Sequence, residues 1–175
     1  MEKYRITLQI LFLLFMLGCE FFKSADKTEQ LPPATQEGKN TFGCLVNGKV
    51  WLPKGSNGTS NLDASYDPTF HGGSLSIYSY SITDGINQFL AFGGDSIATT
   101  GDYPLSTTSR SPGAYFDDQL AGCSYDEPQD IVGGHFNITK LDISNGVIAG
   151  TFEVSFSKAD CATIHITQGR FDLKL

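Results

Sequence analysis

The chain has 175 residues, of which 40% are hydrophobic, 12% aromatic and 18% charged, and its formal net charge is −7. This balance excludes an intrinsically disordered chain, and the acidity argues against nucleic acid as a partner, because binding to phosphates needs clustered basic side chains. The length suits one domain with a substantial hydrophobic core.

The N-terminal residues have the features of a secretory signal. Lys3 and Arg5 precede an unbroken apolar run over 10–17, which is too short to span a bilayer. Gly18 and Cys19 follow, and this ending resembles a bacterial lipobox, in which the cysteine thiol is acylated and becomes the new N-terminus. The resemblance implies a signal peptide over 1–18 and lipidation of Cys19. An ordinary signal peptide that happens to end in cysteine is the alternative.

The following segment is mostly polar, contains two adjacent prolines and shows no periodic pattern. This composition predicts a flexible tether, so we expect residues 19–41 to be the lipidated cysteine and its tether and 42–175 to be the folded domain. The membrane is then a partner through the N-terminal lipid. The expected location is the cell envelope, as an outer-membrane lipoprotein, with the choice between its periplasmic and surface faces open.

From residue 42 onward, apolar runs alternate with turn residues at the spacing of an all-β domain. The first runs predict strands over 42–52, 73–82 and 86–93. Asn47-Gly48 is expected to form a turn or bulge inside the first run, and Asp84-Gly85 a tight hairpin turn. The segment 53–72 is rich in Gly, Ser, Asn and Pro, which predicts a long loop.

The pattern weakens over 95–132, where two short edge strands near 102–105 and 113–116 are expected. It returns as an antiparallel meander over 134–143, 146–157 and 163–174. The alternation of apolar and polar residues switches face near Gln168-Gly169, which predicts a β-bulge. The whole pattern predicts a single antiparallel β-sandwich or flattened barrel of about eight strands.

Three passages, 42–53, 148–154 and 166–172, together resemble a group of uncharacterised Bacteroidota lipoproteins that carry an all-β domain of unknown function. The resemblance covers Thr41 to Leu175 in order and spacing. It implies an envelope location and a β fold. It transfers no activity and no binding residue.

Three cysteines remain besides Cys19, so one internal disulfide at most is possible. Cys44 opens the first strand and Cys161 precedes the last, so these two can pair if the strands are neighbours. A bond between Cys123 and Cys161 is the rival. Three free buried thiols are the further alternative, although an oxidising envelope favours a disulfide.

Carboxylates gather in the weakly patterned middle of the chain, at Asp117, Asp118, Asp126, Glu127 and Asp130. Oxygen-rich loops of this kind can hold calcium or another ligand, but the EF-hand pattern is missing and solvated loop charge is the favoured interpretation. A pair of hydrolytic carboxylates stays open, because sequence does not give their separation. No cofactor is expected, and the three histidines lack metal-ligand spacing.

Aromatic residues offer another kind of site. Tyr78 and Tyr80 alternate along one predicted strand and so share a face. Exposed aromatic side chains can stack on sugars, whereas strand tyrosines more often pack and form a hydrogen bond at their tips. Trp51, between two apolar neighbours, is expected in the core.

No nucleophile elbow, phosphate-binding loop or dinucleotide motif is present. The sequence therefore predicts a membrane-anchored, non-enzymatic module that binds a ligand, either a glycan or another envelope protein. One alternative is a hydrolase of envelope polymers that uses the loop carboxylates. The other is a purely structural or inhibitory lipoprotein.

Overall fold

The computed structural model describes residues 29–108 and 111–175. The expected signal peptide, Cys19 and the first part of the predicted tether lie outside these residues. Within the described residues, no helix is long and apolar enough to cross a membrane.

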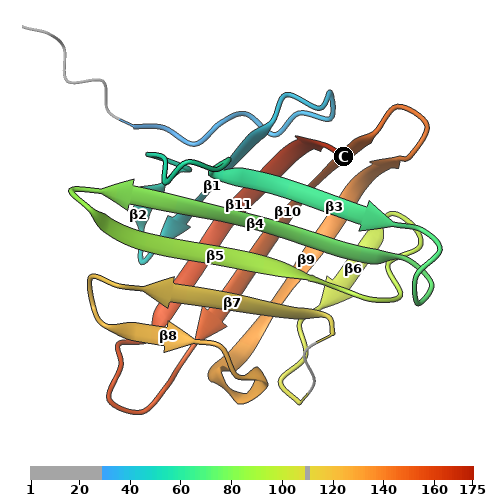
Figure 1. The fold of residues 1–175 in the computed structure, drawn as a ribbon. Helices are drawn as coiled ribbons and strands as arrows, with labels where there is room; N and C mark the ends of the chain where they lie inside the picture. Colours follow the sequence, from blue (N-terminus) through green and yellow to red (C-terminus); the bar gives the residue numbers. More distant parts are fainter. Residues whose placement is uncertain (1–28, 109–110) are drawn as a thin grey trace, which may run out of the picture.

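Two open antiparallel sheets pack face to face as a sandwich (Figure 1). One sheet has six strands in the order β2-β1-β11-β10-β9-β6, and the other has five in the order β3-β4-β5-β7-β8. In Figure 1 the five-stranded sheet is in front, with its outward face toward the viewer. The strands of the six-stranded sheet are β1 (Thr41–Val46), β2 (Lys49–Trp51), β6 (Gly101–Pro104), β9 (Ile131–Asp142), β10 (Val147–Phe156) and β11 (Ile164–Lys174). Those of the five-stranded sheet are β3 (Leu62–Asp67), β4 (Ser74–Thr83), β5 (Ile86–Gly94), β7 (Gly113–Asp118) and β8 (Cys123–Tyr125).

The all-β prediction is confirmed, and of its two forms the sandwich is the one observed. The described residues form more strands than the expected eight, for two reasons. A turn at Asn47-Gly48 divides the first predicted strand into β1 and β2. In addition, β3 lies inside the predicted loop 53–72, and β8 lies in the weakly patterned middle. β8 has only three residues, and turn residues around both strands hide their alternation.

The core between the sheets is built largely from phenylalanine rings. Phe92 of β5 lies 4.6 Å, between ring centroids, from Phe152 of β10, which lies 5.1 Å from Phe42 of β1. Phe152, Val154 and Phe156 are buried and Thr151 is exposed, so side chains of β10 point alternately to the core and to solvent. Each fully buried side chain of this size contributes about 1.5–3 kcal/mol relative to its exposed state, so the ring cluster holds the two sheets together.

The expected bulge near Gln168-Gly169 is present. Phe152 pairs with Gly169 and Val154 pairs with Ile166, so two residues of β11 lie opposite Glu153 alone. Gln168 has a left-handed backbone with φ of 52°. The switch of apolar residues to the other parity in β11 follows from this extra residue.

The predicted flexible tether is wrong for its described part, residues 29–40. The carboxylate of Asp172, only 1% exposed, accepts hydrogen bonds from the Thr35 hydroxyl at 2.6 Å and from the backbone N–H groups of Glu37 and Gly38 at 3.0 and 2.6 Å. Lys140 also donates to the carbonyl of Gln36 at 3.2 Å. The folded unit therefore includes this polar segment, because the buried carboxylate of Asp172 in β11 accepts hydrogen bonds from the segment's backbone N–H groups.

Candidate ligand-binding face

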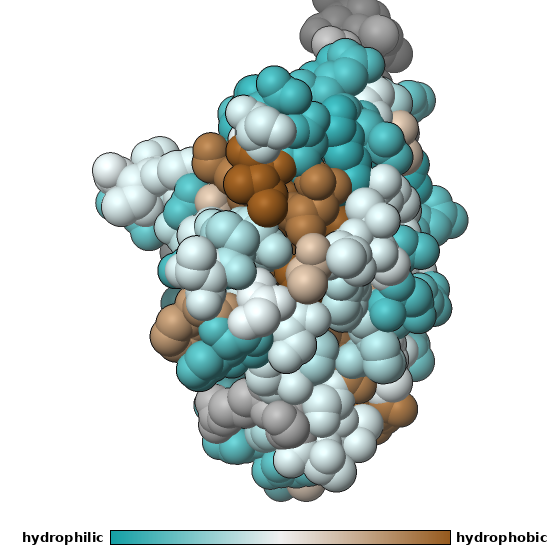
Figure 2. Space-filling view, turned by 90° about the vertical axis from the view of Figure 1, so that its right-hand side faces the viewer, coloured by the Kyte–Doolittle hydropathy of each residue, from teal (hydrophilic) through white to brown (hydrophobic). Residues whose placement is uncertain are grey.

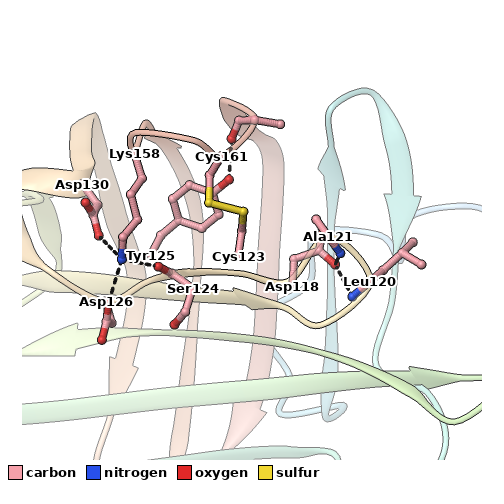
Figure 3. Close-up of a disulfide and its surroundings, with 11 residues drawn as sticks. Asp118, Leu120, Ala121, Cys123, Ser124, Tyr125, Asp126, Asp130, Lys158 and Cys161 are labelled. Atoms are coloured by element: carbon pink, nitrogen blue, oxygen red, sulfur yellow. Dashed lines mark hydrogen bonds and ion pairs between the residues drawn. A yellow bond between two sulfur atoms is a disulfide. The ribbon is translucent and has the colours of Figure 1, made fainter.

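The disulfide joins Cys123 of β8 to Cys161 in the β10–β11 loop, with an S–S distance of 2.07 Å (Figure 3). The preferred pairing of Cys44 with Cys161 is therefore wrong, and the rival pairing is observed. Cys44 is fully buried in the core beside β2, where burial raises the pKa of its thiol to about 12. The side chain of Cys44 points between the sheets, so it cannot reach a loop at the end of the sandwich.

Lys158 gathers part of the predicted acidic loop around its ammonium group (Figure 3). Its Nζ donates to the carbonyl of Ser124 at 2.6 Å and lies 3.3 Å from Asp126 and 3.5 Å from Asp130. Asp130 is buried and accepts a hydrogen bond from the backbone N–H of Glu127 at 3.2 Å. These carboxylates therefore hold the segment after β8 against the β10–β11 loop.

Asp118 is also engaged in local structure. Its Oδ1 accepts hydrogen bonds from Gln88 Nε2 at 3.0 Å and from the backbone N–H of Leu120 at 3.1 Å. Its neighbour Asp117 points to the opposite face of β7, where it pairs with Phe89 across the sheet. In the described part of the chain, no three His, Cys, Asp or Glu side chains form a group that could hold a metal ion, so the five carboxylates are not assembled into a calcium site.

The outward face of the five-stranded sheet carries three ring side chains in contact. Tyr78 of β4 and Phe89 of β5 have ring centroids 6.0 Å apart, and Phe89 and Tyr115 of β7 have centroids 5.5 Å apart. All three are half-buried, so each also presents surface to solvent. We call Tyr78, Phe89 and Tyr115 the aromatic cluster.

The strand register determines the width of this cluster. Ala91 of β5 lies directly opposite Tyr78 on one side and Tyr115 on the other. Since neighbouring strands are about 4.8 Å apart, the two tyrosine backbones are separated by about 10 Å. The small side chain of Ala91 leaves the surface low between them.

Tyr80 shares this face, as predicted, but it is not available to a ligand. It is buried beneath the 53–61 loop, where its hydroxyl donates to Asn57 Oδ1 at 2.9 Å or to the carbonyl of Thr59 at 2.8 Å. Tyr78 lies across the strand pair from Asp63. A hydrogen bond to the Asp63 carboxylate raises the pKa of Tyr78 above its ordinary value.

A groove of about 520 Å³ opens beside Tyr115. Ala91, Gly93 and Gly113 line it with little or no side chain, and Ser76 and Asp126 add polar groups. A Cβ atom at Gly93 would lie 2.1 Å from the carbonyl oxygen of Leu75, so this position accepts only glycine without a backbone shift. The groove is therefore a hollow with polar borders that lies directly beside the aromatic cluster.

Basic side chains occur in the strands of only one of the two sheets. The five strands of the aromatic sheet, all of them described, contain no Lys, Arg or His, whereas they contain Asp63, Asp67 and Asp117 on the outward face. Strands of the other sheet carry Lys49, Lys140, Arg170 and Lys174. The candidate face is therefore acidic.

The histidines contact polar neighbours away from this face. His135 of β9 lies 3.6 Å from both Asp102 and Glu153, and His165 of β11 lies 3.0 Å from the hydroxyl of Ser155. His165 is exposed and His135 half-buried. Both histidines therefore lie at the surface of the six-stranded sheet.

A separate apolar area lies on the side of the sandwich. Figure 2 shows apolar residues gathered there within a mainly polar surface. Ile143 in the β9–β10 turn and Leu175 are 53% and 39% exposed, and both are tied to Gly146 by backbone hydrogen bonds. The area around Ile143 and Leu175 is the surface on which a protein-partner function can be tested.

No protein-family model matches the chain, and comparisons with curated proteins and with solved structures also find no match. The geometry of the candidate face is consequently the basis on which a function can be proposed. Sequence reasoning had found Tyr78 but had missed Phe89 and the groove. The alternation of Phe89 and Ala91 in a predicted strand was the available signal, but it did not reveal which residues lie beside them.

Proposed function

We propose that this protein is a non-enzymatic, envelope-anchored module that binds a carbohydrate on the outward face of its five-stranded sheet. The observation that carries the proposal is the aromatic cluster with a polar-bordered groove beside it. Sugars combine apolar C–H faces with hydroxyl groups. Aromatic rings supply contact area for the former, and carboxylate, hydroxyl and phenol groups supply hydrogen-bond partners for the latter.

The size of the face supports an oligosaccharide over a single sugar. The two tyrosines of the cluster are about 10 Å apart across the sheet, and the groove extends the face beyond Tyr115. All three rings stand on paired strands, so the protein orders little on binding. Such preorganisation lowers the entropic cost of association.

The proposal also includes attachment of the domain to the membrane through its N-terminus. A lipid on Cys19 would hold the domain at the membrane, so that the face meets its ligand at the envelope. The hydrolase alternative finds less support, because Asp118, Asp126 and Asp130 are engaged with Gln88 or Lys158. No pair of them stands free in the groove as an acid and a nucleophile would.

The proposal is tested by binding of the purified protein to an array of oligosaccharides, followed by calorimetry on the bound ones. We expect Tyr78→Ala and Tyr115→Ala each to weaken binding at least tenfold. Phe70→Ala is the matched control, because it removes an exposed aromatic side chain from the β3–β4 loop, outside the candidate face. Thermal unfolding of each variant verifies the fold.

Equal binding by the wild type and both tyrosine variants would place the ligand elsewhere. In that case the area around Ile143 and Leu175 is the next surface to examine, with Ile143→Ser as the first variant. Binding of a protein and of no glycan would favour the partner-binding function.

A further inference from the structure

The carboxylates of the candidate face stand next to the rings of the aromatic cluster. Asp63 lies opposite Tyr78 across the β3–β4 pair, and Asp117 lies opposite Phe89 across the β5–β7 pair. Asp126 lines the groove next to Tyr115. A chain bound along the cluster and the groove would therefore pass each of these three carboxylates.

Only one of the three carboxylates has a basic partner among the described residues. Lys158 lies 3.3 Å from Asp126 and compensates part of its charge. Among the described residues, neither Asp63 nor Asp117 forms an ion pair, and the strands around them contain no basic side chain. An anionic group placed on the cluster would be repelled by both carboxylates, and the described strands beneath it offer no cation to pair with.

We propose that the face selects uncharged glycans and rejects chains that carry uronate or sulfate groups. This inference rests on the carbohydrate-binding function proposed above and adds the class of carbohydrate. At about 4 Å in water, one pair of like charges weakens binding about fivefold, so two carboxylates give more than tenfold discrimination. Neutral sugars meet no such repulsion, and their hydroxyls can donate to the same oxygens.

The experiment compares probes of one length and different charge on the purified protein. Neutral probes are hexamers of glucose, xylose, mannose, galactose and N-acetylglucosamine. The anionic probes are a galacturonate hexamer and a sulfated heparin hexamer. We expect at least one neutral hexamer to bind more than tenfold more tightly than either anionic one, with its binding lost in Tyr115→Ala.

A charge-neutralised variant tests the cause of the selection. Asp63→Asn with Asp117→Asn should raise affinity for the galacturonate hexamer about tenfold or more at low salt. Asp102→Asn, which makes the same type of change in β6 of the other sheet, should leave that affinity unchanged. In 1 M salt, where the Debye length is about 3 Å, the difference between the double variant and the wild type should largely vanish.

The outcomes separate the two proposals. Binding of an anionic hexamer that depends on Tyr115 and equals or exceeds neutral binding would overturn the selection and keep the carbohydrate function. Unchanged galacturonate affinity in the double variant would also overturn it, because the carboxylates would not be the cause. Binding that is indifferent to Tyr115→Ala, or no binding of any probe, would overturn both.

Discussion

Thr35 donates a hydrogen bond of 2.6 Å to the buried carboxylate of Asp172, which lies 137 positions later in the chain. The contact joins the segment before the first strand to the last strand of the sandwich. It means that a part of the chain with the composition of a linker belongs to the folded domain.

Replacing Asp172 should release this segment. Asp172→Asn keeps the size of the side chain but removes the charge that draws the two backbone N–H groups and the Thr35 hydroxyl. We expect a loss of about 1–3 kcal/mol in the free energy of unfolding, measured with urea. Trypsin should also cleave faster after Lys39. Thr35→Ala, which removes one of the contacts, should have a smaller effect, and equal cleavage in all three proteins would contradict the docking.

The same carboxylate makes stability depend on acid pH. Burial raises the pKa of Asp172, but the hydrogen bonds from Thr35, Glu37 and Gly38 outweigh burial and hold it below its usual value. Its contribution to stability is therefore complete above the unfolded pKa of about 3.9 and is lost as the pH falls through the lower folded pKa. Urea unfolding between pH 7 and pH 2 should show a smaller acid loss in Asp172→Asn than in the wild type.

The disulfide should be a major source of stability. It closes a loop with a sequence separation of 38, for which the chain-entropy model gives about 4 kcal/mol. We expect the double variant Cys123→Ser with Cys161→Ser to lose about that amount at neutral pH. Reduction of the wild type should give a similar loss, whereas reduction should not change the double variant.

Cys44 should be inert in the folded protein. Its pKa of about 12 leaves almost no thiolate at pH 8, and its side chain is fully buried. Iodoacetamide at pH 8 should leave Cys44 unmodified in the native state and alkylate it in urea, as measured by peptide mass spectrometry. Rapid native modification would show that β1 opens or that the thiol is exposed.

The bulge in β11 should tolerate no side chain at Gly169. A Cβ there would lie 2.5 Å from the carbonyl oxygen of Phe152 and 2.6 Å from its ring. Gly169→Ala should therefore cost about 1–3 kcal/mol of stability through overpacking. Gly133→Ala is the control, because nothing lies within 4 Å of its Cβ position. Equal stability of the two variants would show that the bulge adapts.

The local pattern of apolar, polar and turn residues was enough to predict the fold class and much of the last third of the chain. The alternation of Phe152, Val154 and Phe156 predicted a half-buried strand, because side chains in a strand point to opposite faces in turn. Asn47-Gly48 predicted its turn, since these residues adopt the left-handed backbone with φ of 48° and 79°. The parity switch near Gln168 predicted the bulge.

Contacts between distant segments were decided by the tertiary structure. Cys161 pairs with Cys123 because the β10–β11 loop meets β8 in space, and no local pattern gives that distance. Asp172 binds residues 35–38 for the same reason. Likewise, the aromatic cluster takes one ring from each of three strands, and it exists because their register places Ala91 between Tyr78 and Tyr115. Alternation tells which face of a strand a residue occupies, whereas strand order and register determine its neighbours.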